Sequence, residues 1–247
     1  MKDISITYWG LTDPGVLNKK NEDSYVCKTK NTGGNEMGIF AIADGVGGLL
    51  DGDIASRIAT NNMSSYWDSL TTDCRPNVIS QTLVTHMEKT NSDIRDLSKL
   101  QKKKMATTLS SLFIVNNACF IAHIGDSRIY RFRRGVLGSS FHQLTKDHSC
   151  LINTEADGRV FQKSVLTECL GYKDTIHPYY SSFPLSQGDI YFLCSDGAYK
   201  TITNDKLKGI ISGSSDLTSV CHNIVYQAKA NNEKDNITVI AVKIGQK

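Results

Sequence analysis

Acidic residues recur in this sequence at the points where the pattern predicts that a β-strand begins or ends. The five sites are Asn21-Glu22-Asp23, Asp44-Gly45, Gly125-Asp126-Ser127, Ser195-Asp196-Gly197 and Asp235-Asn236. A buried carboxylate is costly unless a cation or full hydrogen bonding compensates it, so carboxylates that converge need a counter-ion. Oxygen ligands without nearby His or Cys select a hard divalent cation such as Mg²⁺ or Mn²⁺.

Each acidic site also has a simpler interpretation, because Asp-Gly and Asp-Asn are common turn sequences. The metal interpretation depends on the sites acting together. The apolar run at 37–43 is short enough to be a strand buried on both faces, and it would hold Asp44 rigidly. We expect Gly45, Gly47 and Gly48 to keep the space beside Asp44 open to water, metal or substrate.

The elements that must position these sites are predicted from hydrophobic periodicity and turn residues. Predicted strands cover 4–10, 24–28, 37–43, 108–115, 119–125, 128–132, 141–145, 180–185, 190–195 and 237–244. Predicted helices begin at Asp51 or Asp53 with an aspartate N-cap, begin again at Pro76, and cover 205–211 and 217–230. Residues 147–163 show no clear period and are interpreted as a loop or a short helix. Strands at both ends with helices between them predict one α+β domain over residues 1–247.

Composition restricts the class of protein. Of 247 residues, 28 are basic and 25 acidic, and this balance gives no case for a nucleic-acid-binding surface. The seven cysteines form no C-x-x-C pair, which favours a reducing compartment over a disulfide framework or a zinc site. The N-terminus lacks an apolar core of signal-peptide length, and no apolar run is long enough to span a bilayer. We therefore expect a soluble cytoplasmic protein without membrane partners.

Seven sequence motifs occur in an order that is highly specific. They are NEDSY at 21–25, IADGVGG at 42–48, AHIGDSRIYRFRRG at 122–135, LTKDHS at 144–149, VLTECLG at 165–171, CSDGAY at 194–199 and KDNITVI at 234–240. In these motifs the chain resembles the metal-dependent protein phosphatases of the type 2C, or PPM, family, and its bacterial members in particular. The resemblance implies an α+β fold in which a sandwich of two antiparallel β-sheets is flanked by α-helices. It also implies hydrolysis of phosphoserine and phosphothreonine in proteins.

The resemblance implies a role for each residue at the centre of the site. Asp23 and Asp44 would be metal ligands, with Asp44 bridging two metals. Gly45 would offer its carbonyl oxygen, and Asp196 and Asp235 would complete the pair of metal sites. The expected cofactors are two Mn²⁺ or Mg²⁺ ions, which activate the water that attacks phosphorus.

Two further acidic residues receive roles from the same resemblance. Glu22 would hold a metal-bound water without touching the metal. Asp126 would help Asp196 form a third, weaker metal site. The expected partners are phosphorylated proteins, which would be targets of a serine/threonine kinase in a signalling pathway, and we expect the chain to be a monomer.

The phosphate-binding residue departs from the family pattern. Family members usually have an arginine five residues before the metal aspartate, and here that position is Asn18. An amide cannot supply a charged, bidentate grip on a phosphate. We hypothesise that Lys19 or Lys20 contacts the substrate phosphate in its place; the other interpretation is a pair of exposed loop lysines.

Other departures bear on substrate access. Only residues 150–164 separate LTKDHS from VLTECLG, whereas bacterial relatives usually have a longer flap there and a basic residue where Glu168 stands. Two alternatives to the protein phosphatase therefore remain open. The chain would be a catalytically weak PPM-like sensor or binding module if Asn18 is a lesion. It would be a hydrolase of small phosphate esters if the short flap opens the site.

Overall fold

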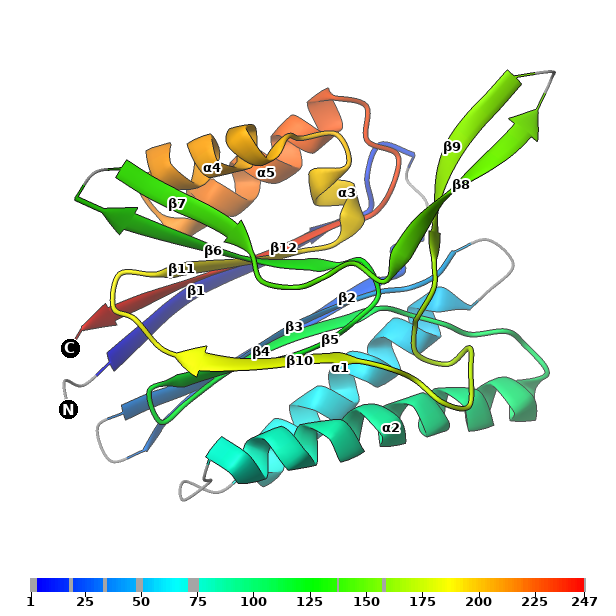
Figure 1. Ribbon diagram of the computed structural model, residues 1–247, viewed down its shortest axis with the longest axis horizontal. Coiled ribbons are helices and arrows are strands. Elements are labelled where there is room, and N and C mark those ends of the chain that lie inside the picture. Colours follow the sequence, from blue (N-terminus) through cyan, green and yellow to red (C-terminus); the bar gives the residue numbers. More distant parts are fainter. Residues whose placement is uncertain are drawn as a thin grey trace.

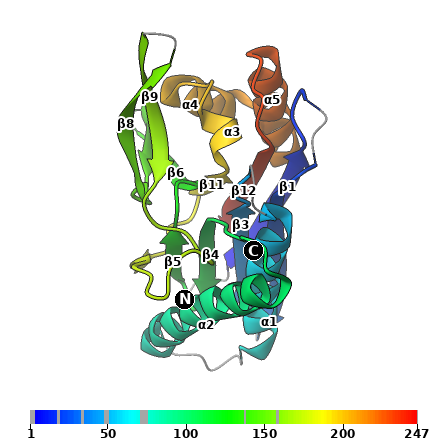
Figure 2. The same cartoon turned by 90° about the vertical axis from the view of Figure 1, so that its right-hand side faces the viewer.

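A computed structural model describes residues 4–17, 20–32, 35–47, 51–70, 76–136, 138–156 and 159–246. Two antiparallel five-stranded sheets lie face to face at the centre of the molecule (Figure 1). Helices cover the outer face of each sheet, which makes four layers when the molecule is seen from the side (Figure 2). The expected α+β sandwich of two antiparallel sheets flanked by helices is confirmed.

The first sheet contains the first and the last strand of the fold. Its order is β1 (Ile4–Asp13), β12 (Ile237–Gln246), β11 (Ile190–Cys194), β6 (Arg128–Gly135) and β7 (Gly138–Gln143). Two helices cover its outer face (Figure 1): α4 (Asn204–Gly213) and α5 (Leu217–Ala230). The four-residue helix α3 (Asp196–Tyr199) follows β11 directly and was not predicted.

The second sheet holds the strand that ends in Asp44. Its order is β10 (Tyr179–Pro184), β5 (Ala118–Ile124), β4 (Leu109–Val115), β3 (Asn35–Asp44) and β2 (Asp23–Thr32). Its outer face packs against α1 (Gly52–Ser69) and α2 (Pro76–Gln101). Pro76 is the first residue of α2, as predicted.

Burial of strand β3 on both faces explains why its sequence is apolar without alternation. Ile39 and Ala41 belong to the core beneath the helices, whereas Phe40 and Ile42 belong to the core between the sheets. All four side chains are fully buried. The prediction of a strand buried on both faces is therefore confirmed, and Asp44 ends a strand that packing holds on both sides.

One local prediction was wrong. Residues 147–163 were predicted to be a loop or short helix, but they include most of a hairpin formed by β8 (Ser149–Ala156) and β9 (Arg159–Leu166). The hairpin projects from the body of the molecule (Figure 1), and apolar Leu151 and Val160 are exposed on it, so no buried face imposes a period of two. At α1, by contrast, the predicted aspartate N-cap is confirmed as Asp51, although its side chain makes no capping hydrogen bond.

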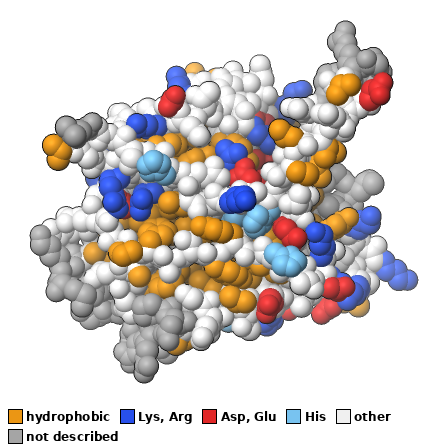
Figure 3. Space-filling model, viewed as in Figure 1, with side chains coloured by type: hydrophobic (Ala, Val, Ile, Leu, Met, Phe, Trp, Pro, Cys, Tyr) orange, Lys and Arg blue, Asp and Glu red, His pale blue; other side chains and the backbone are white. Residues whose placement is uncertain are grey.

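The surface seen in Figure 3 carries charges of both signs without one dominant patch. Hydrophobic side chains gather on the same face between and below the charged ones (Figure 3). In the part of the chain described by the structure, no helix combines the length and apolar character needed to cross a bilayer.

Candidate active site

The acidic cluster forms where strands of the two sheets end beside one another. Asp23 and Asp44 are direct cross-strand partners in the register of β2 and β3. Across the interface, Asp196 begins α3 immediately after β11, and Asp235 lies just before β12. Strands β11 and β12 are neighbours in their own sheet and contact β3, so residues remote in sequence meet at one edge of the sandwich.

Hydroxyl groups from the opposite sheet join Asp23 to the cluster. Its Oδ2 atom accepts hydrogen bonds from Ser195 Oγ at 2.8 Å and from Thr238 Oγ1 at 2.6 Å. Ser195 Oγ also accepts a hydrogen bond from the backbone amide of Thr238 at 2.9 Å. This network fixes Asp23 across the interface between the sheets.

The glycines beside Asp44 allow close packing of backbone segments, in addition to keeping the space beside Asp44 open. A Cβ atom on Gly45 would lie 2.5 Å from the backbone of Gly52 and 2.6 Å from the carbonyl oxygen of Glu22. A Cβ atom on Gly47 would lie 2.8 Å from Glu22 Oε2. Gly45 and Gly47 therefore let three segments meet beside Asp44. Gly48 lies outside the described residues.

A cavity of about 500 Å³ opens over the acidic cluster. The cluster and β3 contribute Glu22, Asp44, Gly45, Asp126, Asp196 and Asp235 to its lining. The base of the β8–β9 hairpin supplies another part of the wall, from Lys163 to Leu166. The hairpin, which replaces the predicted loop, therefore forms part of the boundary of the site.

Burial and mutual repulsion disfavour the charged form of the carboxylates. Burial raises the pKa of Asp23 to about 7 against the opposing effect of the Thr238 and Ser195 hydrogen bonds. Burial, followed by the neighbouring aspartates, raises the pKa of Asp44 well above its ordinary value. For Asp126, burial and the charge of Asp196 raise the pKa to about 6. Such a cluster is electrostatically under-compensated and favours the binding of cations.

The residues present fit a hard divalent cation. All side-chain donors in the cluster are oxygens, and Asp196 Oδ1 is buried without a hydrogen-bond partner. Among the described residues, however, no three acidic, His or Cys side chains are already arranged to hold one ion between them. Part of the cluster is instead arranged around a lysine.

That lysine is Lys200, which was not predicted from the sequence to belong to the site. Its ammonium forms an ion pair with Asp196, four residues earlier, and lies 3.6 Å from Asp235 Oδ2. Burial lowers its pKa, but the carboxylates of Asp196, Asp235 and Asp44 outweigh this and raise it overall. The spacing of four residues after Asp196 was the signal available in the sequence, but recognising it required the unpredicted helix α3.

The predicted phosphate-binding lysines are only partly described. Asn18 and Lys19 lie outside the described residues. Lys20 forms a 2.6 Å ion pair with Asp53 and is not part of the cavity lining. It nevertheless contributes to lowering the pKa of Glu22, although burial raises that pKa overall, so Lys20 lies near the rim of the site.

An arginine supports the loop and the helix that carry two of the acidic residues. The Arg128 guanidinium donates to both carboxylate oxygens of Asp147, at 2.7–3.1 Å, and lies 3.6 Å over the Tyr199 ring. The Tyr199 hydroxyl donates in turn to the backbone oxygen of Asp126 at 2.9 Å. Arg128 therefore connects α3 to the segment of Asp126.

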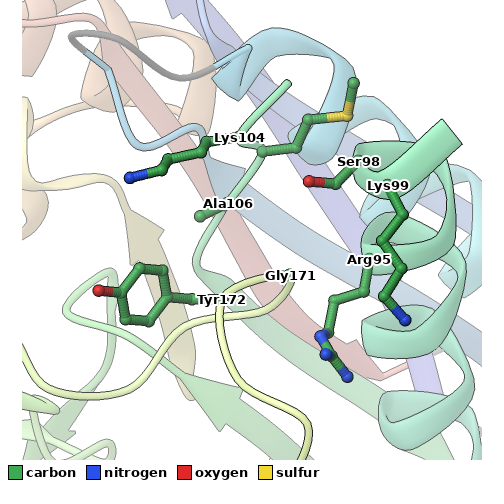
Figure 4. A pocket seen from close by; sticks show the side chains of 8 residues that line it. Arg95, Ser98, Lys99, Lys104, Ala106, Gly171 and Tyr172 are labelled. Carbon is green, nitrogen blue, oxygen red and sulfur yellow. The ribbon is translucent and has the colours of Figure 1, made fainter. Parts of the chain in front are cut away.

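A smaller cavity of about 220 Å³ adjoins the acidic one. Arg95, Ser98 and Lys99 line it from α2, and Lys104 lies on its other side (Figure 4). Ala106 and Tyr172 belong to the walls of both cavities. Arg95 is engaged by Asp174 and Lys99 by Asp96, so much of the positive charge in this cavity is compensated.

Comparison with known proteins agrees with this architecture. A family model described as "Protein phosphatase 2C" matches residues 17–231. Protein phosphatase PhpP of Streptococcus pneumoniae is 32% identical over 245 residues, covering 96% of this chain and 96% of PhpP. The solved serine/threonine phosphatase of S. agalactiae is 26% identical, with a TM-score of 0.81 and coverage of 97% of this chain and 99% of that one.

A second solved structure has the same fold at lower identity. The catalytic domain of the serine/threonine protein phosphatase PstP, in complex with two manganese ions, is 22% identical with a TM-score of 0.77. That alignment covers 98% of this chain and 99% of the PstP chain. The family model spans most of the sequence and PhpP aligns with nearly all of it; the chain belongs to the protein phosphatase 2C family.

Proposed function

We propose that the chain is a metal-dependent serine/threonine protein phosphatase acting as one domain over residues 1–247. The observation that carries the proposal is the convergence of Asp23, Asp44, Asp196 and Asp235 beside a cavity of about 500 Å³. The names of PhpP and of the S. agalactiae enzyme support a protein substrate carrying phosphoserine or phosphothreonine. The PstP domain, which has this fold, holds two manganese ions.

The proposed metal ligands are the four converging carboxylates and the carbonyl oxygen of Gly45, with Asp44 shared between two ions. Both Mn²⁺ and Mg²⁺ suit an oxygen-only donor set. Asp126 would complete a third, weaker site with Asp196, because its charge interacts with that of Asp196 across the cavity. Glu22 would position a water, since Gly47 brings the backbone close to its carboxylate.

When bound, a pair of divalent ions supplies a water of lowered pKa and positive charge against the phosphoryl oxygens. The protein's own residues do the positioning. The Ser195 and Thr238 hydroxyls hold Asp23 in a fixed orientation. The cavity wall from the β8–β9 hairpin limits how a phosphorylated side chain enters. No cysteine nucleophile is needed, and burial raises the pKa of the Cys169 thiol at the cavity to about 11.

Lys19 and Lys20 remain the proposed contacts for the substrate phosphate in place of the family arginine. We further propose that the substrates are targets of a serine/threonine kinase and that the protein acts as a monomer. Buried thiols such as Cys119 and Cys194 support action in a reducing, cytoplasmic compartment.

One observation favours a second candidate function, a catalytically weak sensor or binding module. Lys200 lies among the carboxylates that would bind metal, and Asn18 stands where the family arginine is expected. Both features would weaken catalysis without removing the binding cavity.

Purified protein tests the choice between these functions. With Mn²⁺ it should hydrolyse a phosphothreonine peptide and p-nitrophenyl phosphate, and EDTA should abolish both activities. Asp44→Asn should lose turnover while its circular dichroism spectrum stays that of the wild type. A wild-type protein that binds Mn²⁺ but turns over neither substrate would support the sensor instead. Turnover of the ester alone would indicate a small-molecule hydrolase.

A further inference from the structure

Lys200 places a fixed positive charge inside the carboxylate cluster. Its ammonium contacts Asp196 and lies 3.6 Å from Asp235, and all three side chains line the cavity. These two aspartates come from different segments, one at the start of α3 and one just before β12. A single lysine therefore joins the two parts of the cluster that belong to the first sheet.

The charge of Lys200 compensates only part of the cluster. Asp196 Oδ1 is buried and has no hydrogen-bond partner, although its other carboxylate oxygen meets the lysine. One ammonium carries a single positive charge, half that of a divalent ion, so it cannot compensate several converging carboxylates as a divalent ion would. Among the described residues, no three metal-binding side chains are already arranged around one point, which agrees with a cluster organised around the ammonium.

The lysine has room to leave the cluster. Its side chain is 44% exposed, and the cavity of about 500 Å³ opens beside it. Four rotatable bonds let the ammonium reach solvent without a change in the backbone of α3. The Lys200 ammonium can therefore leave this position when a cation enters the cluster.

We propose that Lys200 is an internal competitor for the divalent ions and thereby sets the metal affinity of the site. In the metal-free protein the ammonium pairs with Asp196 and lies beside Asp235, and it leaves both when a divalent ion is bound. Breaking this ion pair costs free energy, so the net free energy of metal binding is less favourable by that amount and the observed affinity is weaker. This inference rests on the proposed metal centre.

Isothermal titration of Mn²⁺ into the metal-free protein measures the effect directly, without an assay of activity. Lys200→Met should bind Mn²⁺ about tenfold more tightly than the wild type, a gain of about 1.4 kcal/mol. The same variant should have a lower Tm than the wild type in EDTA, because Asp196 and Asp235 lose the lysine ammonium that lies between them. A purely structural role would lower the Tm without tightening the binding of Mn²⁺.

Two further variants control the experiment. Lys200→Arg keeps the charge and should keep the weak affinity of the wild type. Lys206→Met removes an exposed lysine of α4 and should change neither quantity. Equal Mn²⁺ affinity in the wild type and Lys200→Met would overturn the inference but leave the metal centre in place. Failure of both proteins to bind Mn²⁺ would overturn the inference and the proposed metal centre together.

Discussion

Asp23 and Asp44 face each other directly in the register of β2 and β3, so the fold places two carboxylates at the end of one strand pair. Like charges at directly opposed positions destabilise a sheet. Ser195 and Thr238 bind one carboxylate, but neither hydroxyl carries a charge that would offset the repulsion. The protein thus gives up stability at this position for a site that attracts cations.

Asp44→Asn should therefore stabilise the metal-free protein at pH 8. Burial and the neighbouring aspartates raise the pKa of Asp44, so this carboxyl costs the folded protein free energy at pH 8 whether it stays charged or takes up a proton. The uncharged amide should therefore raise the free energy of unfolding by about 1 kcal/mol, or Tm by about 2–4 °C. Thermal unfolding in EDTA measures this, with Asp68→Asn as a control, because Asp68 forms an exposed ion pair with Lys28. A lower Tm for Asp44→Asn would contradict the repulsion between the paired aspartates.

Replacing Lys19 and Lys20 together by alanine should weaken the binding of substrate. Loss of a cation that contacts the phosphate should raise KM several-fold for a phosphothreonine peptide while kcat changes less. Steady-state kinetics at saturating Mn²⁺ measures both constants. Lys28→Ala, which removes a lysine paired with Asp68 on the surface, serves as the control. Unchanged kinetics in the double variant would exclude these lysines from the phosphate site.

Arg128→Lys should destabilise the protein although the charge is kept. A lysine cannot reproduce the two-pronged contact with Asp147 or the stacking on Tyr199. Because the pair is largely buried, we expect a loss of about 2 kcal/mol in the free energy of unfolding. Urea denaturation measures this, and Lys89→Met, in an exposed ion pair with Asp93, should cost under about 0.5 kcal/mol. Equal stability of Arg128→Lys and the wild type would show that Arg128 does not support α3.

The buried His123 should make the protein sensitive to acid. It is fully buried, with Nδ1 2.8 Å from Ser110 Oγ and Nε2 3.1 Å from the backbone oxygen of Lys146. Burial, and then the nearby His148, lowers the pKa of His123 to about 4, whereas in the unfolded chain it is about 6.5. As the pH falls, His123 therefore binds a proton in the unfolded chain at a higher pH than it does in the folded protein. The stability due to the neutral ring is present above about pH 6.5 and is lost as the pH falls towards 4.

His123→Asn tests this contribution. Between pH 7 and pH 5 the wild type should lose about 2 kcal/mol more than the variant, even if the variant is less stable at both values. Urea denaturation in EDTA at the two pH values measures the difference. The acidic cluster titrates in both proteins, so its effect cancels in the comparison. Parallel losses in the two proteins would show that the histidine is already protonated or is not buried when folded.

The sequence by itself determined most of the strands of the two main sheets and the acidic residues near their ends. Asp44 follows an apolar run buried on both faces, and such a run has few ways to fold other than as a central strand. The order of the seven motifs likewise indicated the family, and five of them couple an acidic residue to a strand end. These features are local, so neighbouring residues carry enough information to predict them.

The tertiary structure alone decided which residues meet across the sheets and which charges compensate one another. Lys20 pairs with Asp53, whereas Lys200 pairs with Asp196 and Asp235. The local sequence pattern does not specify which lysine lies beside which carboxylate. The β8–β9 hairpin was not predicted because its strands are exposed, so no buried face gives their sequence an alternating apolar pattern. Electrostatic partners and cavity walls depend on distances between segments remote in the sequence, and those distances exist only once the two sheets have packed together.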